Sequence, residues 1–372
     1  MTPIRTLALL FLRLGMTAFG GPAAHIAMLH YEVVRRRGWL PDEEFAELIA
    51  ITNLIPGPNS TEMAIHVGRR MAGWPGFLVS GVCFILPAAI IVTALAMLYV
   101  HYGRTADARA VMDGVAPVII AVIAHATISI GRATLKDAGT WLIASATAAL
   151  ALAGADELLL LVVAGLVSLG TARAAALSVI LPAAPALGAQ VAAASASVVP
   201  LSSLLLYFLK IGSVLFGSGY VLIAFLRGDL VERLRWLTDQ QLIDAVAAGQ
   251  ATPGPLFTTA TFIGYILRGF EGAVLATVGI FLPAFVFVAL AQRLMPVLRR
   301  STAIRRFLKG VVSASIGLMA AVAVSLSIAT LTGAVHLVAT LVAFLILLRW
   351  RINSAWLVLA GAVLGFMGFR GS

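Results

Sequence analysis

Residues 53–62 read NLIPGPNSTE, and residues 250–259 read QATPGPLFTT. Both stretches contain Pro-Gly-Pro, and the second follows the first by 197 positions. Proline lacks a backbone N–H and clashes with the preceding turn, so neither stretch can continue as a regular helix. The residues that precede both stretches are largely apolar. The sequence therefore predicts two apolar helical segments, each interrupted by a Pro-Gly-Pro break.

The same spacing of 197 positions relates many other residues. FLRLG at 11–15 returns as FLKIG at 208–212, and Phe-Gly at 19–20 returns at 216–217. The spacing becomes 196 further along, where LPA at 86–88 returns at 282–284. Chance would not keep one register through so many glycines and prolines. We predict two homologous repeats at 1–172 and 201–372, joined by an Ala/Ser/Pro-rich connector at 173–200.

The composition excludes a soluble protein. Of the 372 residues, 61% are hydrophobic and 11% are charged, whereas soluble domains have about 45–50% and about 25%. The run 73–100 contains no charge and exceeds the roughly 20 residues that cross a bilayer. The net charge of +10 does not indicate nucleic acid, because the basic residues stand in small groups between apolar runs. We expect an all-α integral membrane protein in a lipid bilayer.

Repeated halves with helix breaks at matching positions are typical of secondary transporters, which hold substrate between the repeats near the midplane. The polar residues around 53–66 would make a poor lipid-facing crossing. We therefore favour five spanning helices per half plus a re-entrant segment broken at Pro-Gly-Pro, which makes the two halves inverted repeats. Six spans per half is the alternative. Both arrangements place the basic loop 299–309 in the cytoplasm.

Two cations occupy equivalent positions inside apolar segments. Arg13 lies in FLRLG and Lys210 lies in FLKIG. A cation in such a segment is costly unless it faces a partner or a wet cavity. The pair predicts a positive site suited to an anion. The alternative is that both side chains reach for a nearby membrane interface.

The helix ends next to the breaks also predict an anion site. A helix N-terminus presents free N–H groups and a partial positive charge. Hydroxyl and amide side chains there can donate to oxyanion oxygens, although they can also simply cap the helix. The predicted anion-binding residues, besides the two cations, are Gly20, Gly21, Gly217, Pro56, Gly57, Pro58, Asn59, Ser60, Thr61, Gln250, Pro253, Gly254, Pro255, Thr258 and Thr259.

Glu62 and His66 are four residues apart, so they share one face of a helix just beyond the first break. A half-buried carboxylate and imidazole can relay protons, and the pair is our candidate for proton coupling. A solvated helix end is the alternative. The other histidines, His125 among them, are interpreted as structural or interfacial. No metal-ligand or nucleotide-binding motif occurs, so we expect no cofactor and no enzymatic activity.

Several motifs together resemble the chromate ion transporter family, in its long, two-domain form. They are residues 11–26, 35–40, 56–62, 86–88 and 250–265. The resemblance spans both halves and implies export of chromate from the cytoplasm, driven by the proton gradient, through two antiparallel halves. It further implies chromate resistance and a multi-pass place in a bacterial inner membrane, with a homodimer as an option. Asn53 and Glu62 stand where many relatives have Gln. Uptake or exchange of sulfate or another oxyanion is the alternative.

Overall fold

The computed structural model describes residues 3–19, 21–103, 105–170, 199–216, 219–331, 333–350 and 352–368. The predicted connector at 173–200 lies outside these residues except for its last two, and so do Gly20 and Gly217. Within the described ranges the regular elements are all helical, as the composition predicts.

The two halves contain the same series of elements in the same order, except that the second half has an additional 3-10 helix, η3. The first half has α1 (Ile4–Thr17), α2 (Gly21–His30), η1 (Tyr31–Arg36), α3 (Asp42–Thr52), α4 (Asn59–Tyr102), α5 (Ala106–Thr134), α6 (Ala138–Leu152) and α7 (Glu157–Ser168). The second half has α9 (Leu201–Val214), α10 (Val221–Leu226), η2 (Arg227–Arg233), α11 (Asp239–Ala251), η3 (Leu256–Thr258), α12 (Thr259–Arg300), α13 (Thr302–Thr330), α14 (Ala334–Arg349) and α15 (Ser354–Gly368). The elements η1 and η2 are π-helical turns. Each Pro-Gly-Pro falls between two helices, after α3 and after α11.

The long helices α4 and α12 are helical hairpins. Each contains a sharp kink, at Ala72-Gly73 and at Arg268-Gly269, where the glycine has φ of +62° or +63°. Beyond the kink the chain folds back. A Cβ on Gly68 would lie 2.3 Å from the carbonyl oxygen of Gly76. Such a turn requires glycine, because other residues rarely adopt positive φ. Each Pro-Gly-Pro break is therefore followed by a short arm, a tight turn and a long arm.

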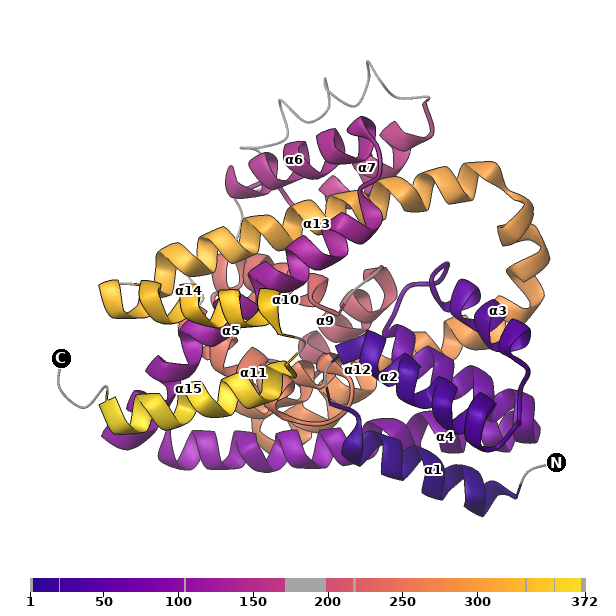
Figure 1. The fold of residues 1–372 in the computed structure, drawn as a ribbon, viewed down its shortest axis with the longest axis horizontal. Helices are drawn as coiled ribbons and strands as arrows, with labels where there is room; N and C mark the ends of the chain where they lie inside the picture. The colour runs from indigo at the N-terminus through magenta and orange to yellow at the C-terminus, as the bar shows by residue number, and fades with distance from the viewer. Residues whose placement is uncertain are drawn as a thin grey trace.

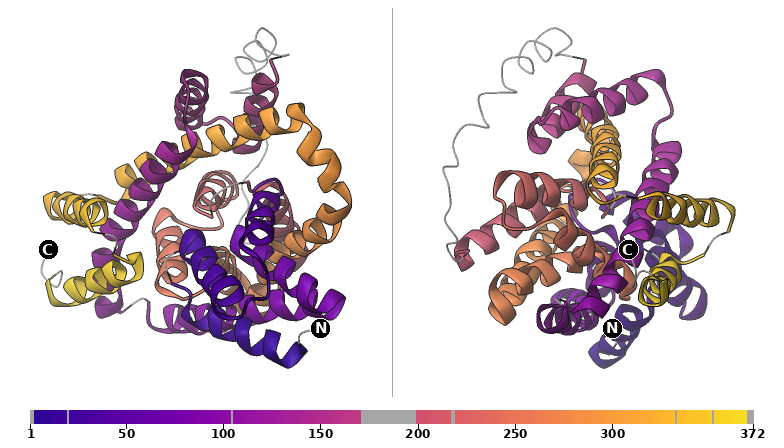
Figure 2. Two further views of the ribbon diagram at one scale, coloured as in Figure 1. Left: turned by 45° about the vertical axis from the view of Figure 1, so that its right-hand side comes forward. Right: turned by 90° about the vertical axis from the view of Figure 1, so that its left-hand side faces the viewer.

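The last two helices of each half pack on the other half. Helix α5 packs against α14 and α15, whereas α13 packs against α6 and α7 (Figure 1). Figure 2 shows both groups from further directions. Small residues allow the close approach: a Cβ on Gly114 would lie 2.3 Å from the Gly361 carbonyl oxygen, and one on Gly317 would lie 2.2 Å from that of Ala144. Each half thus contributes its last two helices to the packing of the other half.

Within the part of the chain that the structure describes, four segments are long and apolar enough to cross a membrane: Asn59–Tyr102, Ala106–Thr134, Leu256–Ala291 and Thr302–Thr330. The shorter helices α14 and α15 expose large apolar side chains such as Leu341 and Leu364, as lipid-facing helices do. The protein is therefore a multi-pass membrane protein. The number of spans per half and the re-entrant segments stay predictions.

Candidate anion site where the helix breaks meet

The breaks of the two halves are joined by reciprocal backbone hydrogen bonds. The N–H of Gly57 donates to the carbonyl of Leu215 at 2.7 Å, and the N–H of Gly254 donates to the carbonyl of Ala18 at 2.8 Å. Gly57 and Gly254 are repeat equivalents, and Ala18 and Leu215 are as well. Each Pro-Gly-Pro is thus bound to the break that follows the first helix of the other half. The two Pro-Gly-Pro breaks and the two breaks at the ends of α1 and α9 therefore meet at one place, with approximate two-fold symmetry.

Both Pro-Gly-Pro glycines also lie against the repeated Leu-Pro-Ala motif of the other half. A Cβ on Gly254 would lie 2.6 Å from the Cβ of Ala88, and one on Gly57 would lie 3.6 Å from the Cβ of Ala284. The φ angles of the two glycines are +101° and +136°. Positive φ and lack of space both require glycine here.

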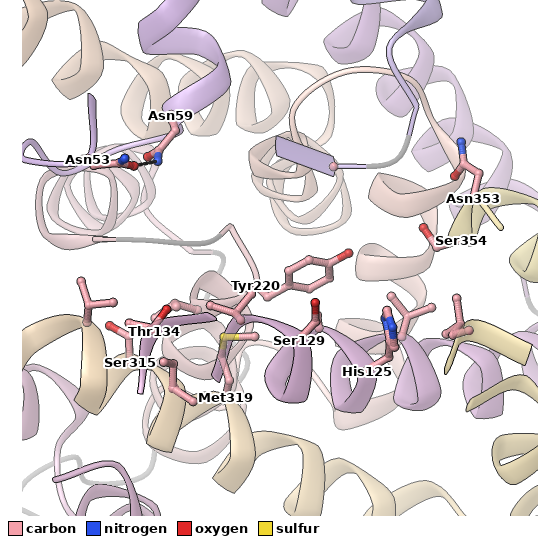
Figure 3. A pocket seen from close by; sticks show the side chains of 18 of the residues that line it. Asn53, Asn59, His125, Ser129, Thr134, Tyr220, Ser315, Met319, Asn353 and Ser354 are labelled. Atoms are coloured by element: carbon pink, nitrogen blue, oxygen red, sulfur yellow. Dashed lines mark hydrogen bonds between the residues drawn. The ribbon is translucent and has the colours of Figure 1, made fainter. Parts of the chain in front are cut away.

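A pocket of about 600 Å³ lies beside the breaks of the first half, between them and helices α5 and α13 (Figure 3). The first residues of four helices line it: Gly21 of α2, Asn59 of α4, Val221 of α10 and Ser354 of α15. The N-termini of α4 and α10 carry no side-chain cap. Backbone carbonyls just before each helix accept from the N–H groups of Thr61 and Glu62 in α4 and of Leu222 and Ile223 in α10. A ligand is thus left with the N–H groups of the very first residues of these helices.

The pocket has a largely apolar wall with polar side chains set into it, and none of the described residues that line it is acidic or strongly basic. Its polar side chains are Asn53, Asn59, His125, Ser129, Thr134, Tyr220, Ser315, Asn353 and Ser354. Asn59 donates to the side-chain oxygen of Asn53 at 2.8 Å, which bridges the first break. The arrangement offers hydrogen-bond donors and the positive ends of helices, without a competing carboxylate.

The structure brings only part of the predicted anion site into this pocket. Gly21 and Asn59 line it, whereas Ser60 and Thr61 are buried in the first turn of α4. The remaining break residues do not line the pocket within the described chain: Pro56, Gly57, Pro58, Gln250, Pro253, Gly254, Pro255, Thr258 and Thr259. Thr258 and Thr259 donate to the carbonyls of Pro255 and Leu256, three residues back, and these bonds do not cap a helix N–H.

Arg13 and Lys210 each pair with a carboxylate instead of lining the pocket. Arg13 binds Glu32, and the Lys210 ammonium lies 3.5 Å from Asp229. Both carboxylates are buried, with 4% and 3% of their side chains exposed. Each carboxylate also forms an ion pair with the arginine four residues further along the chain, Glu32 with Arg36 and Asp229 with Arg233. Sequence reasoning missed the two carboxylates, although they too are 197 positions apart.

The sequence model described as "Chromate transporter" matches this chain twice, over residues 5–170 and 202–366. The chain belongs to the chromate transporter family. It is 35% identical to the chromate transport protein of Pseudomonas aeruginosa, over 96% of this chain and 91% of that protein. It is 32% identical to the chromate transport protein of Cupriavidus metallidurans, over 97% and 92% of the two chains. No solved structure matches the chain significantly. The relatives are named as transport proteins, which fits a transporter rather than an enzyme.

In this chromate transporter homologue, Glu62 and His66 lie along one buried face of the short arm of α4. Both carboxylate oxygens of Glu62 and Nε2 of His66 have no hydrogen-bond partner among the described residues. The carboxylate of Glu62 lies against Gly57, where an added Cβ would be 2.3 Å from Oε1. One turn further, the guanidinium of Arg69 stacks over Trp74 at 3.7 Å. Polar atoms without a described hydrogen-bond partner, in Glu62, His66 and Arg69, therefore follow one another from the break to the hairpin turn.

His125, which sequence reasoning interpreted as structural or interfacial, lines the pocket of this transporter. It lies on α5 and faces the pocket with Ser129, one turn further along (Figure 3). Its signal was weak because apolar and small polar residues alternate on that side of α5. Only the packing of α5 against the breaks makes this face a pocket wall.

Proposed function

We propose that this chain exports chromate from the cytoplasm, coupled to the proton gradient, and holds the anion in the pocket described above. The observation that carries the proposal is the convergence of the first residues of four helices on a pocket whose polar lining, among the described residues, consists of amides, hydroxyls and one imidazole and includes no carboxylate. Helix N-termini attract anions through their free N–H groups and the helix dipole. A volume of about 600 Å³ accommodates a tetrahedral oxyanion with part of its hydration shell.

The neutral lining also suits transport rather than permanent binding. A charge at a helix end contributes about 0.3–1 kcal/mol when exposed and up to about 2 kcal/mol in a favourable buried geometry. Four such ends hold a dianion without a fixed ion pair. The anion can therefore leave again, as a transport cycle requires.

For proton coupling we propose Glu62 and His66. Glu62 is fully buried, without a hydrogen-bond partner in the described chain. A buried unpaired carboxylate is more stable protonated than charged. Glu62 also touches Gly57, whose N–H binds the second half, so a change in its charge acts directly on the contact between the breaks.

The proposed membrane arrangement has inverted halves in a bacterial inner membrane. The first hairpin supports a re-entrant segment, because the end of its short arm returns to the start of α3, where Arg70 pairs with Glu44. In this arrangement Arg13 and Lys210 draw the oxyanion toward the breaks. Their carboxylate partners hold them there and lower their net charge.

A second candidate is the transport of sulfate or another tetrahedral oxyanion. The pocket favours it because its amide and hydroxyl donors recognise shape and charge that chromate and sulfate share. No described lining group distinguishes the two anions.

The proposal is tested by reconstituting the protein into vesicles with an imposed pH gradient and measuring flux of labelled chromate. We expect flux that depends on the gradient and is lost when the gradient is dissipated. Absence of chromate flux from correctly inserted protein would contradict the proposal. Competition by excess sulfate, together with sulfate flux of its own, would instead establish the second candidate. A matched pair, Glu62→Gln and Glu44→Gln, separates proton coupling from general damage, because Glu44 lies outside the break and is paired with Arg70.

A further inference from the structure

The broken helices of the two halves are buried to very different extents. All six residues of α10 are buried, whereas its counterpart α2 is largely intermediate in exposure. In α11, eight of 13 residues are buried, and in its counterpart α3, three of 11 are buried. Equivalent sequences thus lie in different surroundings, so the difference comes from what each half packs against.

The packing partners account for this difference. Helix α10 packs against α13, and α11 packs against α5 and α15. Within the described chain, the counterparts α2 and α3 make no comparable contact with α5, α13 or α7. On that side the pocket separates the broken helices from α5 and α13. One side of the molecule is therefore open and the equivalent side is closed.

The closed side is held by polar contacts between α7 and the π-helical turn η2. Asp156, which caps α7, forms an ion pair with Arg233 at 3.2 Å. The carboxylate of Glu157 lies directly against Gly228, with no room for a Cβ. We call these two contacts the latch.

The counterparts of the latch are apart on the open side. Asn353 and Ser354, at the start of α15, stand where Asp156 and Glu157 stand in the first half. Both line the pocket. Arg36, the counterpart of Arg233, pairs with Glu32. The open side thus has the same parts as the closed side, with the acidic pair replaced by an amide and a hydroxyl.

We infer that this chain contains a second, presently closed anion pocket, the repeat counterpart of the observed one, which opens as the first closes. Its lining would be Gln250 in place of Asn53, Ala321 in place of His125, Ser325 in place of Ser129, and Asp156 and Glu157 in place of Asn353 and Ser354. The inference rests on the proposed transport function for its purpose, but not on which anion is carried. Two carboxylates in the second pocket repel an oxyanion. The observed pocket is therefore the loading side, and the second pocket is the release side.

The test measures water access to the two pockets without any substrate, so it can fail or succeed independently of chromate flux. In a Cys83→Ala background, Ser129→Cys reports on the observed pocket and Ala321→Cys on the second one. Ala321 is 6% exposed. We expect a membrane-impermeant maleimide to label position 129 readily and position 321 slowly, in vesicles accessible from both sides.

Breaking the latch should then shift both labelling rates in opposite directions. Asp156→Asn removes an ion pair whose loss shifts a two-state equilibrium by on the order of fivefold. We expect labelling at 321 to rise and labelling at 129 to fall by about that factor. The matched variant Asn353→Asp restores on the open side the carboxylate that Asp156 supplies to the latch. It should favour pairing with Arg36 when that side closes, and so lower labelling at 129.

The inference requires that the labelling rates at positions 129 and 321 change in opposite directions. A variant that merely loosens the fold raises labelling at both positions, and this result would overturn the inference. No change at either position would do so too, because it would mean that the exposure of α2 and α3 has another cause, such as cover by a second copy of the chain. Should Asp156→Asn fail to insert, Arg233→Gln removes the same ion pair from the other side.

Discussion

The two Pro-Gly-Pro breaks share their backbone geometry but differ in their side chains. Each donates one glycine N–H to the opposite half. In the second break the hydroxyls of Thr258 and Thr259 are bound to nearby carbonyls. In the first break the carboxylate of Glu62 and the hydroxyl of Thr61 have no described partner. The backbone is thus symmetric where the halves hold each other. The side chains are asymmetric where a proton or an anion would bind.

The largest effect that we predict concerns Arg13 and Lys210, the two cations paired with buried carboxylates. We predict that Arg13→Ala and Lys210→Ala each abolish anion transport, measured as vesicle flux, because each removes positive charge beside a break. Stability should fall more for Lys210→Ala. Asp229 then keeps only Arg233, whereas Glu32 keeps both Arg36 and Arg37.

The double variants Arg13→Ala/Glu32→Gln and Lys210→Ala/Asp229→Asn separate attraction of the anion from neutralisation of a buried carboxylate. If the cations attract the anion, transport stays lost in both doubles. Recovery of transport in a double would show that its cation serves only to neutralise the acid, and would remove that cation from the anion path.

The carboxylate partners of these cations could not be predicted from the sequence, although the equivalence of the cations could. The spacing of 197 predicted which residues are equivalent, and so paired Arg13 with Lys210 and Gly57 with Gly254. It did not predict Glu32 and Asp229 as partners, because both lie in charged stretches, YEVVRR and RGDLVER, that look like solvated loops. It is the tertiary structure that buries these acids beside Arg13 and Lys210.

The pocket, and the packing of the last two helices of each half on the other half, could not be predicted for a different reason. Helices such as α6 and α14 are apolar on most faces, with small residues that fit many neighbours. Periodicity therefore indicates that they are helices but not which helix they contact. His125 became a pocket residue only through such a contact, so no pattern in α5 alone could have identified it.

The next largest effect concerns Gly57 and Gly254, the glycines whose N–H groups join the two halves. We predict that Gly254→Ala lowers the free energy of unfolding by about 3 kcal/mol and Gly57→Ala by about 2 kcal/mol. Both variants strain a positive φ. In Gly254→Ala the new methyl group also meets the Cβ of Ala88, which cannot move without its helix, whereas in Gly57→Ala it meets the movable carboxylate of Glu62. Unfolding in detergent, followed by helical circular dichroism, measures both.

Ala88→Gly serves as the control for that difference. Combined with Gly254→Ala, it should restore about 1 kcal/mol or more, because it removes the clash but leaves the strained φ. Combined with Gly57→Ala, it should restore nothing. Equal losses in the two single variants, with no rescue, would mean that backbone strain alone sets the cost and that the halves are equivalent here.

The smallest effect lies in the two hairpins. In the second half, Thr261 and Thr277 share a hydrogen bond of 2.7 Å across the hairpin, whereas Ile65 and Gly81 stand in their places in the first half. Thr277 already donates to the Ala273 carbonyl, so Thr261 is the donor between the two threonines. We predict that Thr261→Val costs about 1 kcal/mol of stability, measured by the same unfolding.

The control is a double-mutant cycle with Thr277→Val. Loss of one shared hydrogen bond makes the two substitutions non-additive, so the double variant should lose clearly less than the sum of the single variants. The first hairpin makes the same fold with no hydroxyl at either position, because a Cβ on Gly81 would come within 2.8 Å of the Ile65 side chain. Close packing there replaces the hydrogen bond. If Thr261→Val costs nothing, both hairpins are held by packing and glycine turns alone, and the chemical difference between the halves is confined to the breaks.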